Sequence, residues 1–259
     1  MNMYQKNGLV WFDSEAAQVP GIEYRFFGRT GGVSKEPYAS LNGRLGQGEL
    51  ATHVEENKRR VAEAMGAQDI VLATQVHGTK ALWVEAENDD IGEADALMTQ
   101  AKGLVIAVKT ADCVPIVVMA ENGQWCAVIH AGWRGACQGI IAETLTAFKK
   151  RVSGALMAVI GPSIRAESYQ VGSDVYEGFI GHKNRDMFLR PNPNNKGKFF
   201  LDLPGFCAYQ LKAYGAMRAV DVGLNTYTEA DRFFSCRRAA HQGQGAQFGC
   251  QFSAVKIEE

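Results

Sequence analysis

The sequence of residues 113–130 is Cys-Val-Pro-Ile-Val-Val-Met-Ala-Glu-Asn-Gly-Gln-Trp-Cys-Ala-Val-Ile-His. Two apolar segments rich in β-branched residues, 114–120 and 125–129, flank Glu-Asn-Gly at 121–123. An Asn-Gly pair between two such segments is a strong signal for a β-hairpin. We therefore expect two neighbouring antiparallel strands joined by a turn at Asn122 and Gly123.

This hairpin brings Cys113 and His130 together, because they lie at similar distances on the two sides of the turn. In any register that the turn allows, the two residues are directly opposite or one diagonal step apart. A thiolate and an imidazole at one end of a hairpin can hold a metal ion, or can act as nucleophile and base. These residues alone leave both possibilities open.

Length and composition predict one soluble domain. A chain of 259 residues with 46% hydrophobic content can bury a full core, and we expect residues 1–259 to form a single domain. Its 27 basic and 28 acidic residues nearly balance, which argues against nucleic acid or an anionic membrane as the main partner. Residues 1–20 lack a long apolar run, and six scattered cysteines fit reduced thiols, so we expect a cytoplasmic protein.

Apolar periodicity predicts strands and helices in a mixed order. Strands are expected at residues 21–27, 70–76, 80–85, 104–108, 156–160 and, half-exposed, 248–254; helices are expected at 52–65, 136–152, 174–180 and 202–215. Helices are inserted between strands, while hairpins are also present. We therefore predict an α/β fold with layers of mixed β-sheet and flanking helices.

Histidines and one carboxylate extend the candidate site around Cys113. His77 follows the strand expected at 70–76, and with Cys113 and His130 it makes a thiolate-plus-two-imidazole set suited to Zn²⁺ with one open position. The alternative is core packing of Cys113 and ordinary hydrogen bonding of the histidines. Asp112, beside Cys113, either orients a ligand and moves a proton or is a surface carboxylate. The remaining histidines are interpreted as surface residues: His53, His182 and His241.

Two arginines are candidates for binding an anion. Arg29 lies in Gly-Arg-Thr-Gly-Gly-Val-Ser at 28–34, where consecutive glycines can form an anion-binding concavity. A Gly-Gly turn with a surface arginine is the alternative interpretation. Arg134 lies near the start of the helix expected at 136–152, where free N–H groups favour an anionic ligand.

Several ordered motifs resemble the YfiH-like family, whose members are variously called laccase-domain proteins, polyphenol oxidases, purine nucleoside phosphorylases and peptidoglycan editing factors. The resemblance spans about residues 24–238. The motifs are Arg-Thr-Gly-Gly-Val-Ser at 29–34, Pro-Tyr at 37–38, Ser-Leu-Asn at 40–42, Gln-Val-His-Gly at 75–78, Ala-Asp-Ala-Leu at 94–97, Ala-Asp-Cys-Val-Pro at 111–115 and His-Ala-Gly-Trp-Arg-Gly at 130–135.

The resemblance implies a YfiH-like fold and a single zinc ion bound by His77, Cys113 and His130. It also implies phosphorolysis of adenosine, inosine and 5′-methylthioadenosine, with adenosine deamination at the same site. The other residues expected at the site are Asp112 as acid–base partner, Cys113 as a catalytic ligand, and Arg29, Ser34, Asn42 and Arg134 as substrate- or phosphate-binding residues. The chain departs from the family at Asn225-Thr226, where Cys-Thr is frequent, and after Arg237-Arg238.

Other functions make different demands on the same residues. A peptidoglycan-precursor editing hydrolase would share the site, whereas a thiol hydrolase without metal would use Cys113 as nucleophile and His130 as base. A copper oxidase is disfavoured, because multi-electron oxygen chemistry needs several coppers and the chain has only five histidines. A non-catalytic scaffold would show neither bound metal nor turnover. The expected partners are small molecules, and the sequence carries no signal for oligomeric state.

Overall fold

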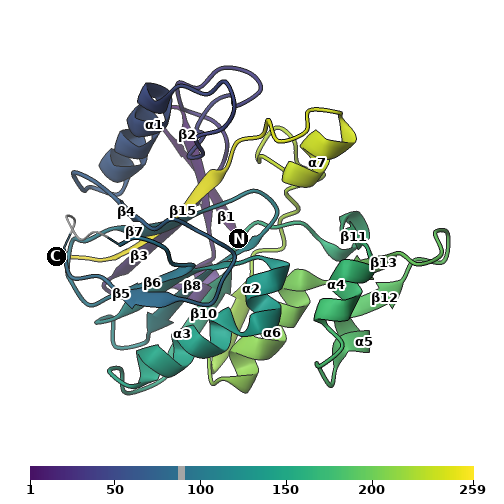
Figure 1. Cartoon of the computed structure of the whole chain (residues 1–259). Coiled ribbons are helices and arrows are strands. Elements are labelled where there is room, and N and C mark those ends of the chain that lie inside the picture. Colours follow the sequence, from purple (N-terminus) through teal and green to yellow (C-terminus); the bar gives the residue numbers. More distant parts are fainter. Residues whose placement is uncertain (87–90) are drawn as a thin grey trace.

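The computed structural model describes residues 1–86 and 91–259 and has four layers, in which two six-stranded sheets face each other between helices (Figure 1). The first sheet has the order β1 (Asn2–Lys6), β2 (Leu9–Asp13), β3 (Ile22–Phe27), β15 (Gln251–Ile257), β7 (Ile106–Thr110) and β4 (Val71–Leu72). The second has the order β14 (Arg218–Asp221), β10 (Leu156–Ile160), β8 (Val114–Ala120), β9 (Cys126–Ala131), β6 (Ala96–Thr99) and β5 (Ala81–Trp83).

Helices and a small sheet complete the architecture. The α-helices are α1 (Ala51–Ala64), α2 (Trp133–Gln138), α3 (Ile140–Lys149), α4 (Ser173–Gly178), α5 (Arg185–Phe188), α6 (Leu203–Ala213) and α7 (Cys236–His241). The short helices η1 (Glu15–Ala17) and η2 (Ala166–Ser168) and a sheet of β11 (Gln170–Val171), β13 (Phe199–Leu201) and β12 (Leu189–Pro191) lie in the connections. Both large sheets contain parallel and antiparallel pairs, so the predicted mixed α/β fold is confirmed. Within the described residues, no helix has the length and apolar character needed to span a bilayer.

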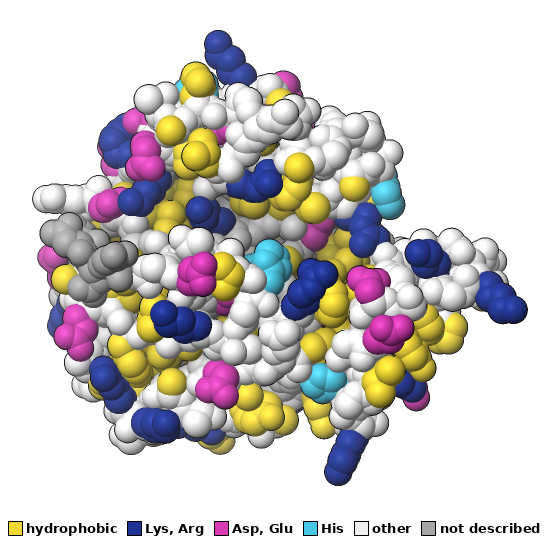
Figure 2. Space-filling model, in the orientation of Figure 1, with side chains coloured by type: hydrophobic (Ala, Val, Ile, Leu, Met, Phe, Trp, Pro, Cys, Tyr) yellow, Lys and Arg dark blue, Asp and Glu magenta, His cyan; other side chains and the backbone are white. Residues whose placement is uncertain are grey.

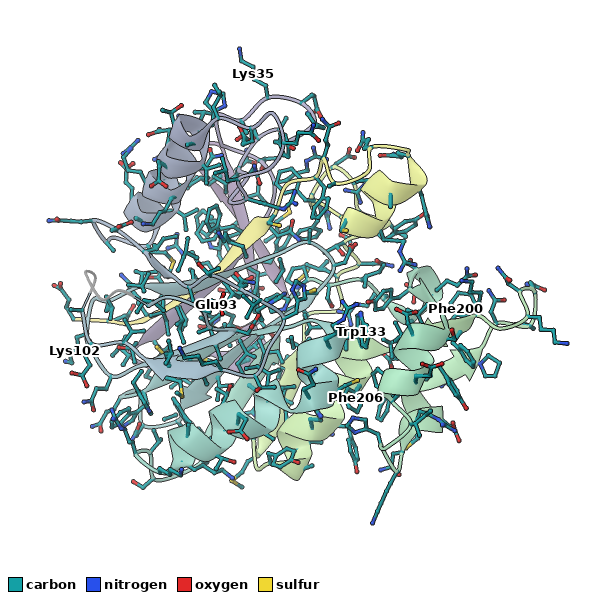
Figure 3. All side chains as sticks on the ribbon, viewed as in Figure 1. Lys35, Glu93, Lys102, Trp133, Phe200 and Phe206 are labelled. Atoms are coloured by element: carbon teal, nitrogen blue, oxygen red, sulfur yellow. The ribbon has the colours of Figure 1, made fainter. Side chains whose placement is uncertain are left out.

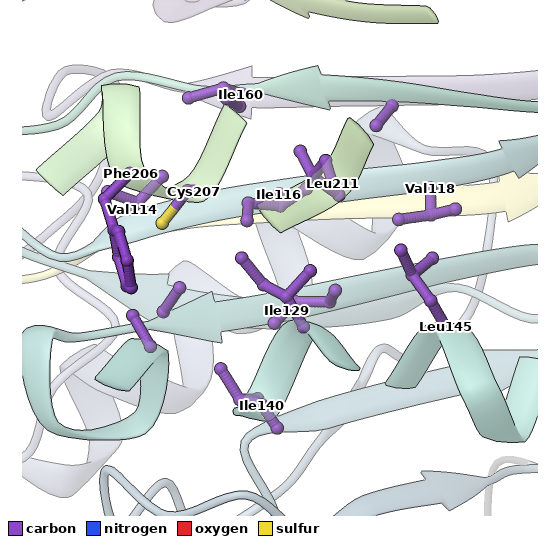
Figure 4. Packing of buried hydrophobic residues seen from close by; sticks show 14 of the residues in the cluster. Val114, Ile116, Val118, Ile129, Ile140, Leu145, Ile160, Phe206, Cys207 and Leu211 are labelled. Carbon is purple, nitrogen blue, oxygen red and sulfur yellow. The ribbon is translucent and has the colours of Figure 1, made fainter. Parts of the chain in front are cut away.

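Alternating side chains place one face of each strand in the space between the two sheets. Phe26 and Val255 of the first sheet and Val117, Val128 and Val159 of the second belong to one buried cluster. The outer faces are covered by helices. In Figure 4, side chains of α3 and α6, such as Leu145 and Leu211, lie against Ile116 and Ile129. A strand with both faces buried requires a nearly continuous apolar run, which explains why every residue of segment 114–120 is apolar.

The hairpin predicted from residues 113–130 is formed by β8 and β9. Its register pairs Pro115 with His130, so Cys113 lies one diagonal step from His130, as expected. The turn is longer than a two-residue Asn-Gly turn, because the Ala120 N–H donates to the Trp125 carbonyl. Gly123 alone takes the left-handed conformation, with φ of 74°.

Three elements differ from their predicted extents for local reasons. The helix expected at 136–152 is two helices, α2 and α3, separated by Gly139 with φ of 101°. The strand expected at 70–76 is only β4, because the Gln75 side chain bonds both the N–H and the carbonyl of Lys109 at 2.8 Å and replaces the backbone ladder. The strand expected at 248–254 as half-exposed is β15, which begins at Gln251, ends at Ile257 and is buried on both faces between β3 and β7.

Candidate metal centre

Three side chains from separate segments converge at one end of the sheets. His77 is in the loop after β4, Cys113 is between β7 and β8, and His130 is in β9. Their candidate ligand atoms all lie within 4.8 Å of one another. The Cys113 Sγ is 3.8 Å from the His77 Nε2, and the two imidazole rings meet edge to face with centroids 4.7 Å apart. The structure therefore brings together the three residues predicted to bind the metal.

Asp95, just before β6, orients the imidazole of the buried candidate ligand His130. Its Oδ1 is 2.7 Å from the His130 Nδ1, and its carboxylate also accepts the backbone N–H groups of His77 at 3.0 Å and Gly78 at 2.7 Å. Burial opposes ionisation, but these hydrogen bonds lower the pKa of Asp95 below its ordinary value. An ionised carboxylate at Nδ1 leaves Nε2 with its lone pair free for a metal.

Two glycines of the motif at 130–135 allow the candidate ligands to approach so closely. A Cβ added to Gly132 would lie 2.7 Å from the His77 Cδ2 and 3.2 Å from the Cys113 Sγ. A Cβ on Gly135 would lie 2.7 Å from the Gly78 carbonyl oxygen. These glycines are therefore needed for close packing around the site.

The electrostatic environment favours neutral ligands before a cation is bound. Desolvation, and then the neighbouring His130, lower the pKa of His77. Desolvation, and then Asp112, raise the pKa of the Cys113 thiol. A metal ion would displace the thiol proton on binding, because the thiolate is the ligand form. The same raised pKa disfavours Cys113 as a free thiolate nucleophile near neutral pH.

A cavity of about 630 Å³ opens beside the three candidate ligands. Figure 2 shows the hollow on this face, with a histidine and several Lys or Arg side chains around it. Two cations, Arg44 and Lys109, line it, and none of its lining residues in the described ranges 1–86 and 91–259 is a carboxylate. Apolar groups and thiols, including Leu72, Phe248, Cys236 and Cys250, also line it, together with a few uncharged polar side chains such as Thr110.

Asp112 is engaged with the C-terminal segment. Its Oδ1 accepts the Thr226 hydroxyl at 2.7 Å, and its Oδ2 accepts the backbone N–H of Arg237, the second residue of α7, at 2.6 Å. The residue has φ of 83°, and it is not among the residues that line the cavity. Thr226 and Arg237 thus hold the loop that carries Cys113. Both residues lie close to the positions at which the sequence departs from the family pattern.

Arg29, Ser34 and Asn42 lie in a different polar network. The Arg29 side chain donates to the carbonyls of Ala39 and Ala230 at 2.8 and 3.0 Å. The Asn57 amide donates to the Ser34 hydroxyl at 2.9 Å, and the Asn42 side chain bonds backbone groups and Glu49. None of the three predicted residues lines the cavity. The structure therefore does not bring them to the candidate ligands.

Arg134 and the three histidines outside the cluster do not belong to the set of candidate ligands. Arg134 is exposed at the second position of α2, with its guanidinium 4.4 Å from the Trp133 ring centroid. It is near enough to contribute to the lowered pKa of His77. Trp133 itself packs on Gly178 of α4, in the region where α2, α4 and α6 meet (Figure 3). The histidines interpreted as surface residues have partners away from the cluster: His53 with Glu49, His182 with the Cys137 carbonyl, and His241 with Tyr227.

Sequence reasoning assigned no role to Asp95, Arg44 or Lys109. Asp95 lies in the Ala-Asp-Ala-Leu motif, but its function depends on a histidine and on backbone groups distant in sequence. Lys109 follows three apolar residues in the mostly buried strand β7, and a cation at such a position is a signal of a role beyond packing.

The fold and the site define a class of mixed α/β sandwich proteins with one thiol and two imidazoles at an open cavity. Residues 23–257 match the family described as multi-copper polyphenol oxidoreductase laccase, and the chain belongs to this family. It is 31% identical to a protein of Rickettsia conorii named purine nucleoside phosphorylase, over 85% of this chain and 90% of that protein.

Further relatives confirm the predicted membership of the YfiH-like family. A protein of Escherichia coli K12 named purine nucleoside phosphorylase YfiH is 34% identical over 85% of this chain and 90% of its own length. A crystal structure of a Neisseria meningitidis protein of the family DUF152 has a TM-score of 0.85 and 29% identity, covering 98% of this chain and 100% of that one.

Proposed function

We propose that the protein is a zinc-dependent purine nucleoside phosphorylase acting on adenosine, inosine and 5′-methylthioadenosine, with adenosine deaminase activity at the same site. The observation that carries this proposal is the convergence of His77, Cys113 and His130 beside a cavity that, among the described residues, is lined by two cations and no carboxylate. The cavity has the size of a small-molecule site. The names of the relatives supply the nucleoside specificity in the proposal.

Three protein donors would leave one position of a tetrahedral zinc for water or substrate, which is the arrangement of catalytic zinc sites. Zinc bound there would act as a Lewis acid and lower the pKa of a bound water toward neutrality. Thiolate and imidazole donors also suit copper. Oxidation of polyphenols by dioxygen would need several coppers, however, and the described residues contain one such three-donor cluster. We therefore propose zinc.

The residues of the chain have separate tasks in the proposed reactions. In phosphorolysis, a phosphate oxygen bonds to C1′ of the ribose, the C1′–N9 bond breaks, and the purine leaves with the electron pair and takes up a proton. The cationic wall would bind the phosphate and stabilise its charge. In deamination, water adds at C6 of adenine and ammonia leaves. Asp95 would keep the His130 Nε2 free, and Gly132 would keep the ligands close.

Asp112 takes a positioning role in this proposal and not the acid–base role predicted from sequence. Proton transfer needs a carboxylate oxygen near the reacting group, and both Asp112 oxygens accept hydrogen bonds from the C-terminal segment. Asp112 would therefore act by fixing the loop that carries Cys113. Arg134, at the rim, is proposed to attract anionic substrate at longer range.

The test is metal analysis of protein purified without added metal, followed by incubation with adenosine and phosphate. We expect one zinc per chain and the appearance of adenine, inosine and hypoxanthine. His77→Ala should lose zinc and turnover together. The matched control is His53→Ala, which removes a histidine of α1 outside the cluster and should keep both. Full turnover by a zinc-free protein would contradict the proposal, as would activity only on a peptidoglycan precursor.

A further inference from the structure

Lys109 is a partly buried cation that forms no ion pair in the described part of the chain, and Glu55 acts on its pKa only from beyond ion-pair distance. Its backbone is fixed at the end of β7, because the Gln75 amide bonds its N–H and carbonyl. Its Nζ forms no ion pair or hydrogen bond with described residues, and the side chain lines the cavity. Buried lysines are usually paired, because an unpaired buried ammonium loses its hydration without compensation.

Arg44 is a second cation of the same cavity, and it is already held in place. Its Nη1 donates to the carbonyls of Ala246 at 2.8 Å and Phe248 at 3.2 Å. The guanidinium lies 4.3 Å from the Phe248 ring centroid. No carboxylate in the described residues forms an ion pair with it, so its remaining N–H groups are available to an oxyanion. A fixed guanidinium suits bidentate recognition of a phosphate.

The two cations lie in the same part of the cavity, around Cys250. Burial raises the pKa of the Cys250 thiol to about 12, and both Arg44 and Lys109 act in the opposite direction. Burial also lowers the pKa of Lys109, and a bound anion would offset this effect. Thr110, the next residue, lines the cavity too, and its buried hydroxyl has no hydrogen-bond partner among the described residues.

We propose that Lys109 and Arg44 form the subsite that binds inorganic phosphate, as a part of the cavity distinct from the three metal-ligand candidates. Unpaired positive charge, a fixed guanidinium and an unpartnered hydroxyl together match a small oxyanion. This inference rests on the proposed function. It makes a prediction that the function alone does not make: the subsite serves phosphorolysis, which uses phosphate, and not deamination, which uses water.

The test compares Lys109→Met with the wild type in both reactions. Loss of one charge-assisted hydrogen bond should raise the KM for phosphate about 10- to 100-fold. Deamination of adenosine without phosphate should change less than about threefold, since it does not use the subsite. Lys109→Arg should recover most of the phosphate affinity. The matched control is Lys58→Met, which removes a nearby cation of α1 that is paired with Asp69 and does not line the cavity.

A binding measurement separates this inference from the proposed function. Calorimetric titration of the zinc-containing wild type with inorganic phosphate should show saturable binding that Lys109→Met and Arg44→Gln each weaken about tenfold or more. Lys109-dependent binding in a protein with no nucleoside turnover would support the subsite and reject the proposed function. An unchanged phosphate affinity in both variants, with zinc content and circular dichroism intact, would overturn the subsite. Absence of phosphate binding by the wild type would overturn it as well.

Discussion

Two polar clusters of the molecule use similar residues in opposite ways. At the candidate metal centre, the candidate ligand atoms of His77, Cys113 and His130 face one another, and the one contact recorded for them among the described residues is that between the Cys113 Sγ and the His77 Nε2 at 3.8 Å. In the second cluster, the Asn57 side chain accepts from the Val33 N–H and donates to Ser34, Ser40 and Asn42. The candidate ligand atoms of the first cluster border a cavity and remain available to a metal ion. The polar groups of the second cluster are largely buried and are hydrogen-bonded to one another.

The difference indicates that the polar residues of a motif can bind a ligand only where their side chains are not already used in hydrogen bonds within the protein. Both clusters carry family motifs, and both were predicted to contain binding residues. In the structure, the second cluster ties the loop at 29–42 to α1 through Asn57. Variants that change one cluster and leave the other intact would test this difference.

The largest effect is expected for Cys113→Ser. Removing one ligand should lower zinc affinity more than the 10- to 100-fold typical of residues that only support a ligand, so we expect a loss greater than about 100-fold. Adenosine turnover should fall in parallel. Competition with a chelator measures the affinity, and Cys137→Ser, outside the cavity, is the control. Equal zinc affinity of the two variants would contradict the ligand assignment.

Asn57→Ala should affect the second cluster alone. It would leave the Val33 N–H and the Asn42 carbonyl without their partner beside the fully buried position 57, while the Ser40 carbonyl would keep only the Ser34 N–H, which costs about 2–4 kcal/mol of the free energy of unfolding. Urea unfolding measures this change. Zinc stoichiometry and the KM for adenosine should stay as in the wild type. A variant with full stability but impaired substrate binding would show that the second cluster is a binding site after all.

A smaller effect on the metal centre is expected for Asp95→Asn. The amide keeps the size of the carboxylate but loses its charge beside His130, so zinc affinity should fall about 10- to 100-fold. Spectroscopic titration with Co²⁺ would follow both affinity and ligand geometry. The control Asp69→Asn removes a surface carboxylate paired with Lys58. If Asp95→Asn bound metal as tightly as the control, the orienting role would be wrong.

The smallest effect is a pH dependence of stability from Glu49. Desolvation opposes ionisation, but hydrogen bonds from Asn42, Ser34 and the Leu50 N–H lower the pKa of Glu49 below its ordinary value of 4.5. A depressed pKa in the folded state means that the carboxylate stabilises the fold above pH 4.5. This contribution is lost as the pH falls through the folded pKa.

Thermal unfolding between pH 3 and pH 6 would detect this contribution as a difference between the wild type and Glu49→Gln. We expect the melting temperatures of the two proteins to converge at the acid end of the range, where Glu49 is protonated. Parallel curves over the whole range would exclude the contribution. Zinc content at neutral pH should be the same in both proteins.

The elements that sequence predicted well are those set by local pattern. Segments 114–120 and 156–160 are uniformly apolar, and both are strands at these bounds. The helix expected at 52–65 matches α1 within one residue at each end. The pairing of the sheets was not predictable, since β15, near the C-terminus, lies between β3 and β7. Nothing in local periodicity specifies such a partner.

The residues of the candidate site also divide into those that local sequence indicates and those that only the tertiary structure defines. His77, Cys113 and His130 were recognised from residue type, strand ends and motif. Asp95 and Lys109 were not recognised as candidate site residues because their proposed roles depend on the tertiary structure. Asp95 bonds His130, and the Lys109 ammonium has no hydrogen-bond or ion-pair partner among the described residues. The hydrogen bonds of Asp112 were not foreseen for the same reason, since its partners Thr226 and Arg237 lie more than a hundred residues away in sequence.

The most direct measurement of the central claim is X-ray absorption spectroscopy of the metal in protein purified without added metal. We predict zinc with one sulfur at about 2.3 Å and two imidazole nitrogens at about 2.0–2.1 Å, with a light atom completing the shell. Cys113→Ser should lose the sulfur signal. A wild-type spectrum without sulfur, or a protein that retains no metal, would contradict the account.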